Sequence, residues 1–257
     1  MLPDYLEDFS KIALYGAGWK SISLVDVFKK VAFTIWLCGC NLKCPFCHNY
    51  RLAESYQEVY RKMNAKTIVD KLRVSKNYVD YFLVSGGEPL LQFRELSKLL
   101  WYIKYFVGVK VGVNTNLTLS KEIKEMLEQN LVNFIATDIK APHLELYGLD
   151  EKESERLWKS YLESLKIVSE RKILLEVRIP VLKKFDAIKF KFEVENALNL
   201  LRESECEYYI RLNPILGPPY IIARDNIWLR EYGNPSTKNM EIVREILIQL
   251  GFRDKIV

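Results

Sequence analysis

Residues 40–48 read Cys40-Asn-Leu-Lys-Cys44-Pro-Phe-Cys47-His48 and hold three of the chain's five cysteines. The first two of these cysteines are separated by three residues, and the second and third by two. Cysteine thiolates are the usual protein ligands of iron–sulfur clusters, and a [4Fe–4S] cluster has four ligand positions. Three closely spaced thiolates therefore predict a cluster that keeps one iron open to bind a further molecule.

The same stretch allows two other interpretations. Cys44-Pro-Phe-Cys47-His48 matches the C-x-x-C-H pattern to which c-type haem is attached. Haem attachment normally goes with export, and the N-terminus has no feature of a signal peptide, which disfavours this interpretation. Three cysteines and a histidine could also hold a closed structural zinc ion. The spacing by itself leaves zinc open.

Residues 39–49 resemble the cluster loop of the radical S-adenosylmethionine (SAM) enzymes, whose pattern is C-x3-C-x-aromatic-C. Phe46 stands at the aromatic position, and His48-Asn49 after the third cysteine is similar to the activating enzymes of glycyl-radical enzymes. Activators of pyruvate formate-lyase and of anaerobic ribonucleotide reductase carry this pair. The resemblance implies that Phe46 and His48 lie at the cofactor site and that three thiolates bind a [4Fe–4S] cluster: Cys40, Cys44 and Cys47.

Length and composition indicate one ordinary globular domain, 1–257, with 1–30 as an N-terminal lead-in. The net charge of +5 is spread over interspersed charged side chains, which argues against a nucleic-acid partner. No apolar run reaches the roughly 18 residues of a membrane helix. Reactive thiols without an export signal favour the cytoplasm. Within the lead-in, Gly16-Ala-Gly18 is interpreted as a turn.

Apolar runs typical of buried strands alternate six times with segments of helical spacing. The predicted strands are 31–37, 79–84, 107–113, 132–139, 173–179 and 207–212, and the predicted helices are 68–74, 93–105, 121–129, 153–169, 187–202 and 239–250. This alternation predicts an α/β fold with a parallel sheet. Eight such units close a TIM barrel. Six predict a partial (βα)6 TIM-like barrel, which the radical SAM resemblance independently implies.

Ser85-Gly86-Gly87-Glu88 follows the second predicted strand, where the radical SAM enzymes have their G-G-E motif. The resemblance implies that these four residues hold the amino group of SAM. A carboxylate suits an ammonium group because the hydrogen bond between them is charge-assisted. Glycines let the backbone approach a ligand closely.

Three further segments are assigned to the SAM site. Asn114-Thr-Asn resembles the D-T-N-G segment of the activating enzymes, with Asn114 in place of the acid and Leu117 in place of the glycine. Asp138-Ile-Lys140 resembles their D-[LIV]-K segment, and the resemblance implies that both charged residues contribute to the site. Arg178 lies inside an apolar strand, so it needs an anionic partner, and the resemblance places it on the SAM side.

The remaining cysteines and the second histidine have simpler interpretations. Cys38 and Cys206 are expected to be small buried core residues, because neither fits the spacing of the loop. His143 is expected to be an ordinary loop residue. No side chain is singled out as a catalytic acid or base.

The resemblance implies reductive cleavage of SAM to a 5′-deoxyadenosyl radical, which would install a glycyl radical on a partner glycyl-radical enzyme. A ferredoxin or flavodoxin would supply the electron. Two alternatives remain open. The chain could be a radical SAM enzyme that modifies a small molecule or nucleic acid, or a zinc-stabilised binding module without turnover.

Overall fold

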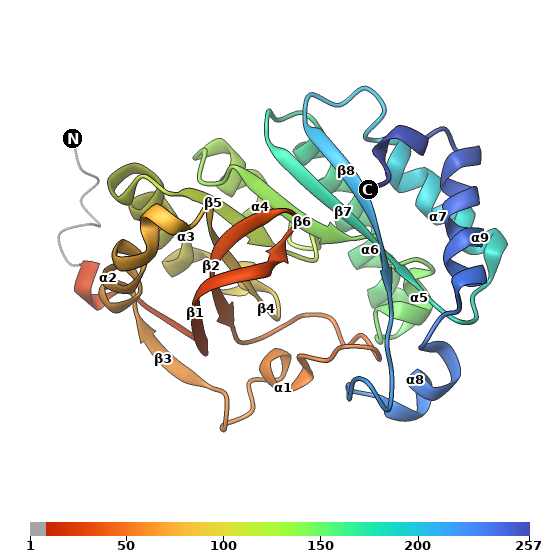
Figure 1. Cartoon of the computed structure of the whole chain (residues 1–257), viewed down its shortest axis with the longest axis horizontal. Coiled ribbons are helices and arrows are strands. Elements are labelled where there is room, and N and C mark those ends of the chain that lie inside the picture. The colour runs from red at the N-terminus through yellow and green to blue at the C-terminus, as the bar shows by residue number, and fades with distance from the viewer. Residues whose placement is uncertain (1–8) are drawn as a thin grey trace. The chain divides into compact units, whose positions relative to one another are not determined.

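The computed structural model describes residues 9–257, and residues 1–8 of the predicted lead-in lie outside the described part. The described residues form eight strands in one sheet, in the order β3-β1-β2-β4-β5-β6-β7-β8 (Figure 1). Two compact units can be distinguished. The first unit holds the described part of Met1–Asn41 with Arg51–Thr115 and Lys121–Ile135, and the second holds Leu42–Tyr50, Asn116–Ser120 and Ala136–Val257.

Strands and helices alternate along the chain after the first hairpin. The strands are β1 (Ala13–Val27), β2 (Lys30–Leu37), β3 (Arg61–Asn64), β4 (Tyr81–Gly86), β5 (Lys110–Asn114), β6 (Phe134–Asp138), β7 (Leu174–Val181) and β8 (Glu207–Pro214). The α-helices are α1 (Tyr50–Ala53), α2 (Ala65–Ser75), α3 (Phe93–Tyr102), α4 (Ser120–Glu128), α5 (His143–Leu146), α6 (Glu151–Ser169), α7 (Ala187–Asn199), α8 (Asn226–Tyr232) and α9 (Thr237–Gln249). Short 3-10 helices are η2 (Phe9–Lys11), η3 (Lys76–Tyr78), η4 (Pro89–Gln92) and η6 (Arg253–Lys255), and η5 (Ile103–Val107) is a π-helix.

The expected turn at Gly16-Ala-Gly18 is wrong, because both glycines lie inside the long strand β1. β1 pairs antiparallel with β2, and the register shifts between Gly16 and Gly18. A Cβ atom added to Gly16 would lie 2.1 Å from the carbonyl oxygen of Trp36. Gly16 therefore permits close backbone approach at a bulge within a continuing strand. β1 and the short β3 were not predicted as strands.

Each of the six predicted strands is present. In the first unit, β2 pairs parallel with β4, and β4 pairs parallel with β5. In the second unit, β7 pairs parallel with β8. The register places Leu37 opposite Gly86, so the chain leaves β2 and β4 at the same level of the sheet. Loops that follow these two strands are therefore neighbours.

Four helices of the second unit, α6 to α9, begin at short polar side chains that accept hydrogen bonds from the first turn. Such side chains satisfy backbone N–H groups that have no partner within the helix. These N-cap residues are Asp150 for α6, Asp186 for α7, Asp225 for α8 and Ser236 for α9. The caps set where each helix starts, and α9 packs against β7 and β8 (Figure 1).

Alternation of side chains along β7 separates the core from a polar face. Leu175, Val177 and Ile179 are fully buried. Between them stand Glu176 and Arg178, which point to the opposite face because side chains alternate along a strand. One face of β7 thus packs apolar side chains into the core, and the opposite face carries the charged side chains of Glu176 and Arg178.

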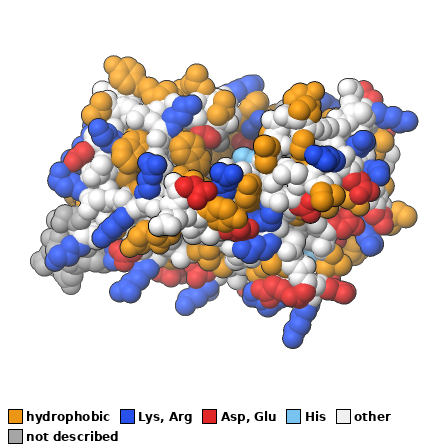
Figure 2. All heavy atoms as spheres, turned by 90° about the horizontal axis from the view of Figure 1, so that it is seen from below, with side chains coloured by type: hydrophobic (Ala, Val, Ile, Leu, Met, Phe, Trp, Pro, Cys, Tyr) orange, Lys and Arg blue, Asp and Glu red, His pale blue; other side chains and the backbone are white. Residues whose placement is uncertain are grey.

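No helix among the described residues has the length and apolar character to cross a bilayer. Lys and Arg side chains are interspersed with Asp and Glu side chains over the face that Figure 2 shows. This face therefore has no extended patch of one charge sign.

Candidate functional site

Strand ends in the first unit bring the Gly-Gly-Glu segment against the backbone that leads into Cys40. The N–H group of Gly87 donates to the carbonyl oxygen of Leu37 at 2.9 Å, and that of Glu88 donates to the carbonyl oxygen of Gly39 at 2.7 Å. A Cβ atom at Gly87 would lie 2.0 Å from this Gly39 oxygen. Glycine at position 87 is therefore required by the contact between the two loops.

Glu88 is fully buried and connects the ends of β4 and β5. Its carboxylate accepts hydrogen bonds from the Thr115 hydroxyl group, at 2.9 and 3.0 Å, and from the N–H group of Leu90 at 3.0 Å. These contacts orient the carboxylate and cap η4. Binding of a SAM amino group by Glu88 stays a prediction. Thr115, a residue that sequence reasoning left without a role, positions the Glu88 carboxylate.

The side chain of Asn114, at the end of β5, donates to the Ser85 hydroxyl oxygen at 3.1 Å. The neutral amide thus links two of the predicted SAM-site residues within the first unit. Hydrogen bonding of this kind fixes the side chains relative to one another at the ends of neighbouring strands. The substitution of an amide for the expected acid is therefore compatible with an ordered strand end.

Leu117, in the second unit, stands at the position of the expected glycine and has a backbone conformation that glycine tolerates better than leucine. Its φ angle is +56°, in the left-handed region, and its side chain is fully buried. A left-handed conformation costs a non-glycine residue roughly 1–2 kcal/mol. Burial of a leucine side chain contributes about 1.5–3 kcal/mol, which offsets that cost.

Asp138 forms the centre of a partly buried charged triad in the second unit, in which Lys140 is the most deeply buried member. Its Oδ1 atom lies 2.8 Å from Nε of Arg178, and its Oδ2 atom accepts a hydrogen bond from Nζ of Lys140 at 3.0 Å. Burial opposes ionisation of Asp138, but the positive charges of Arg178 and Lys140 outweigh this effect and lower its pKa to about 2. The prediction that Arg178 needs an anionic partner is confirmed, and the partner is Asp138.

The cluster loop lies close to this triad within the second unit. Burial opposes the charged form of Lys140, yet the negative charges of Asp138 and then of the Cys44 thiolate raise its pKa. Removal of its imidazole from water lowers the pKa of His48, with the charge of Asp138 acting in the opposite direction. The second unit therefore brings together four of the residues predicted from separate motifs: Cys44, His48, Asp138 and Lys140.

A segment far along the chain clamps the cluster loop. The guanidinium group of Arg224 donates to the carbonyl oxygen of Cys44 at 2.9 Å. The backbone N–H of Arg224 donates to the carbonyl oxygen of Cys47 at 3.1 Å, and that of Asp225 donates to Pro45 at 3.0 Å. Arg224 was missed by sequence reasoning, and no local pattern could have identified it.

Phe46, the aromatic residue of the loop, packs against α8. Its ring centroid lies 6.3 Å from that of Trp228. Phe46 and Trp228 border an apolar cluster that includes Leu146, Leu182 and Leu229. The aromatic residue of the motif therefore anchors the loop to the core of the second unit, while its predicted position beside bound cofactors stays a prediction.

His143 differs from its expected place in a loop, because it is buried at the first residue of α5. Its Nδ1 atom lies 3.0 Å from Glu193, and its Nε2 atom lies 3.5 Å from Glu155. Its ring stacks on Trp158 at 5.1 Å. These contacts give His143 a structural role in joining α5, α6 and α7.

Cys38 and Cys206 are buried as predicted, and none of the five cysteines forms a disulfide. Burial raises the pKa of both Cys38 and Cys206, which keeps them as thiols. Among the described residues, no three side chains of His, Cys, Asp or Glu form a ready metal site. The assignment of three other thiols as cluster ligands thus depends on their spacing, and thiolates are the donors that iron–sulfur clusters take.

The family model of the Radical SAM superfamily matches residues 34–191, more than half of the chain. The chain belongs to this superfamily. The matched residues include the cluster loop, the Gly-Gly-Glu segment and the Asp138 triad. Membership implies a [4Fe–4S] cluster and SAM as cofactors and identifies the protein as a radical SAM enzyme.

Two curated proteins share parts of this radical SAM sequence. A Methanocaldococcus jannaschii protein, provisionally named as a glycyl-radical enzyme activating enzyme, is 32% identical over 124 residues, which cover 48% of this chain and 49% of that protein. The 7-carboxy-7-deazaguanine synthase of Hyperthermus butylicus is 34% identical over 80 residues, which cover 31% of this chain and 32% of that protein. The chain therefore matches about half the length of the first relative and about a third of the length of the second.

The crystal structure of a radical SAM methyltransferase from Sphaerobacter thermophilus resembles this protein in fold, with a TM-score of 0.56. The likeness covers 86% of this chain and 67% of that one at 16% sequence identity. At this identity the likeness concerns the fold alone. The predicted fold class, an α/β partial TIM-like barrel of the radical SAM type, is confirmed.

Proposed function

We propose that this radical SAM enzyme installs a glycyl radical on a partner enzyme. The observation that carries the proposal is the 32% identity to the Methanocaldococcus jannaschii protein named as an activating enzyme of this kind. The His48-Asn49 pair after the third cysteine supports the same activity, because it is similar to that of the activating enzymes. The partner and its glycine-containing loop belong to the proposal.

The residues of the chain divide the work. Thiolates of Cys40, Cys44 and Cys47 would hold the [4Fe–4S] cluster, which when bound supplies the electron that cleaves SAM to a 5′-deoxyadenosyl radical. The predicted SAM ligands in the first unit are Ser85, Gly86, Gly87, Glu88 and Asn114, and those in the second unit are Asp138, Lys140 and Arg178. Glu88 suits the amino group, and the cationic side chains suit the carboxylate.

A ferredoxin or flavodoxin is the proposed electron donor, and the cytoplasm is the proposed compartment. The proposed donor follows from the resemblance to the activating enzymes, and the proposed compartment follows from the reactive thiols of the loop, which persist in a reducing environment. The zinc-stabilised binding module has lost its support, because membership of the superfamily implies an iron–sulfur cluster. Iron and sulfide analysis of anaerobically purified protein would check this point directly.

The second candidate function is modification of a small molecule. It is favoured by the 34% identity to a 7-carboxy-7-deazaguanine synthase, an enzyme named for a small heterocyclic product. The motifs that the chain shares with such relatives concern SAM and the cluster. They do not distinguish a polypeptide substrate from a small one.

Anaerobic electron paramagnetic resonance separates the two functions. The candidate glycyl-radical enzyme is incubated with the reduced protein and SAM, and we expect the doublet of a carbon-centred glycyl radical. The Cys44→Ala variant serves as the control without a cluster ligand. Absence of the doublet, with SAM cleavage intact, would reject the activating function and leave the radical SAM assignment unchanged.

A further inference from the structure

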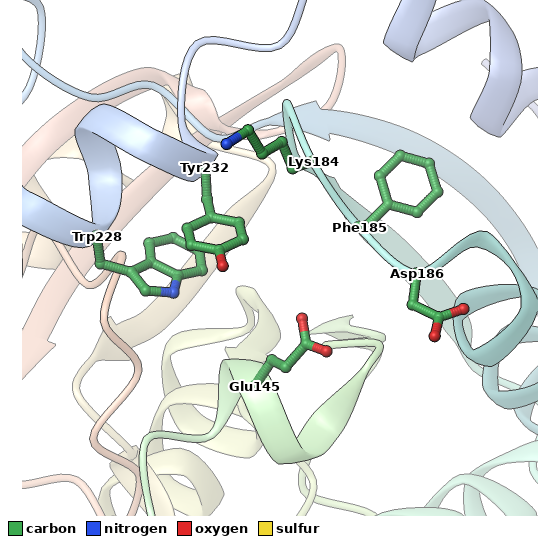
Figure 3. Close-up of a pocket in the computed structure, with 6 residues that line it drawn as sticks. All are labelled: Glu145, Lys184, Phe185, Asp186, Trp228 and Tyr232. Atoms are coloured by element: carbon green, nitrogen blue, oxygen red, sulfur yellow. The ribbon is translucent and has the colours of Figure 1, made fainter.

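The second unit contains a pocket of about 390 Å³ beside α8 (Figure 3). Ligand pockets in proteins typically have volumes of about 300–1,000 Å³. The lining residues are Glu145, Lys184, Phe185, Asp186, Trp228 and Tyr232. They combine aromatic rings with two carboxylates, and none of them belongs to the predicted SAM site.

Aromatic side chains form one wall of this pocket. The rings of Trp228 and Tyr232 stack on each other with centroids 4.8 Å apart and planes 18° apart. Phe185 is held by packing against Phe190, with ring centroids 5.0 Å apart. Both contacts fix ring positions before any ligand binds. The faces of Trp, Tyr and Phe rings attract cations, with Trp the strongest of the three.

Carboxylates provide the charge in the pocket. The carboxylate of Glu145 has no hydrogen-bond or ion-pair partner among the residues that the structure describes, whereas its backbone N–H group donates to the carbonyl oxygen of Pro142 at 3.2 Å. Asp186 uses its Oδ1 atom to cap α7, accepting from the N–H groups of Ile188 and Lys189 at 3.0 and 3.1 Å. In Figure 3 the Tyr232 hydroxyl group and the Glu145 carboxylate point into the same central space.

Lys184 contributes the one positive charge of the lining. Its Nζ atom lies 3.2 Å from Oε1 of Glu231, which is outside the lining. Figure 3 shows the amino group directed away from the carboxylates of Glu145 and Asp186. The positive charge of Lys184 is therefore balanced by Glu231, and the space inside the pocket remains acidic.

The side chain of Trp228 connects the pocket with the cluster loop. Trp228 lines the pocket and also packs against Phe46 at 6.3 Å. Its walls come from α5, from the residues between β7 and α7, and from α8, so they lie after the strands β6, β7 and β8. A group bound here would be close to the loop that is assigned to the cluster.

We propose that this pocket binds a basic side chain, arginine or lysine, of the polypeptide substrate. The identity of that substrate as a polypeptide rests on the proposed function. A guanidinium or ammonium group would stack on the rings of Trp228 and Tyr232 and pair with Glu145 and Asp186. An acidic side chain would meet two like charges, and a neutral one would leave the charge of the Glu145 carboxylate unpaired.

The test uses the holoprotein with its tryptophan indoles labelled with ¹⁵N. The chain has five tryptophans, and the Trp228→Phe variant assigns the signal of Trp228. N-acetyl-arginine methylamide and N-acetyl-lysine methylamide are titrated as probes. The citrulline and glutamate counterparts serve as the neutral and acidic controls. We expect the basic probes to shift the Trp228 signal. The Kd obtained from this shift should be at least about tenfold lower for the basic probes than for the citrulline probe.

Matched variants separate pocket charges from general surface charge. Glu145→Gln and Asp186→Asn should each weaken binding of the arginine probe about five- to tenfold, and asparagine still caps α7. Lys184→Met should tighten binding about twofold, because it removes a positive charge. Glu163→Gln, on the exposed face of α6, should leave binding unchanged. Equal binding of the citrulline or glutamate probe, equal effects of Glu145→Gln and Glu163→Gln, or no Trp228 shift would each overturn the proposal.

A second arm distinguishes failure of the pocket from failure of the proposed function. A glycine-deuterated peptide from the partner's radical loop, with and without an arginine, is assayed for transfer of deuterium to the 5′-deoxyadenosyl radical, measured as deuterium in the product 5′-deoxyadenosine. Transfer from both peptides at equal KM would reject the pocket and leave the glycyl-radical function intact. Arginine binding at Trp228 without transfer from either peptide would reject the glycyl-radical function, and with it the assignment of the bound side chain to a polypeptide substrate.

Discussion

The guanidinium group of Arg224 donates a hydrogen bond to the carbonyl oxygen of Cys44 at 2.9 Å, although the two residues are 180 positions apart in the sequence. Two backbone hydrogen bonds from the same segment reach Cys47 and Pro45. The segment that follows β8 therefore holds the loop that carries two of the three assigned thiolates. The shape of the loop depends on a part of the chain outside the motif.

Replacement of Arg224 by methionine should loosen this loop. Loss of a hydrogen bond from a charged group costs about 1.5–3 kcal/mol. We expect lower iron content after anaerobic reconstitution and faster loss of cluster absorbance, with Arg224→Lys intermediate because lysine keeps the charge. Arg230→Met, at an exposed position of α8, is the matched control. Equal iron retention in the Arg224→Met and Arg230→Met variants would contradict a role of Arg224 in holding the cluster loop.

The three cysteines of the loop should differ from the two in the core. Alanine at Cys40, Cys44 or Cys47 should abolish cluster binding and SAM cleavage. Alanine at Cys38 or Cys206 should leave both largely intact, because burial keeps these two as thiols. The iron and sulfide content per protein, measured after anaerobic purification, tests which cysteines bind the cluster. Complete loss of iron in the Cys38→Ala variant would show that the ligand set is wrong.

Substitution of two charged residues tests the predicted SAM ligands. Lys140→Met and Glu88→Gln should each weaken SAM binding about ten- to a hundredfold, with the cluster assembled, because each removes a charged hydrogen-bonding group. Thr115→Val should have a smaller effect in the same direction, since the Thr115 hydroxyl group orients the Glu88 carboxylate. Isothermal titration of SAM checks the order of the effects. Wild-type affinity in both charged variants would remove these residues from the site.

Asp138 should make the stability of the fold depend on pH in the acid range. Its pKa of about 2 lies below the value near 3.9 of an unfolded chain. Its contribution to the free energy of unfolding is therefore present above about pH 4, and it is lost as the pH falls through about 2. This difference in pKa corresponds to about 2–3 kcal/mol.

Urea unfolding at several pH values measures this contribution. Asp138→Asn should be less stable at neutral pH, because it leaves Arg178 and the buried Lys140 without their anionic partner. The difference from the unmodified protein should shrink between about pH 4 and pH 2. A difference that stays constant over this range would contradict the assignment of the low pKa.

Leu117 should respond to glycine unlike an ordinary buried leucine. Leu117→Ala loses buried surface, at a cost of about 2–5 kcal/mol, and keeps the strained left-handed backbone. Leu117→Gly also loses that surface but relieves the strain, so it should be at least as stable as the alanine variant. Leu127, buried in α4, is the control, and there glycine should be less stable than alanine by about 1 kcal/mol. Thermal unfolding of the four variants gives the comparison.

Spacing along the chain was sufficient for the features that depend on near neighbours. The run of cysteines in 40–47 indicated a thiolate ligand set, because ligands on one loop are encoded by their separation. Apolar runs such as 31–37 predicted the positions of six strands, since burial on both faces of a parallel sheet needs continuous apolar residues. Family resemblance then joined the strand-end motifs to one cofactor.

Other features arise only when distant residues meet in the fold. The turn expected at Gly16 is a bulge, because the conformational freedom of glycine has the same local signal in both cases. The pKa of Asp138 depends on Arg178, which the fold brings within 2.8 Å. Arg224 and Trp228 reach the cluster loop through packing of a late segment, and no local periodicity encodes such a contact. The sequence thus predicted the ligands of the cluster, whereas the contacts of Arg224 with the loop and the acidic aromatic pocket were decided by tertiary structure.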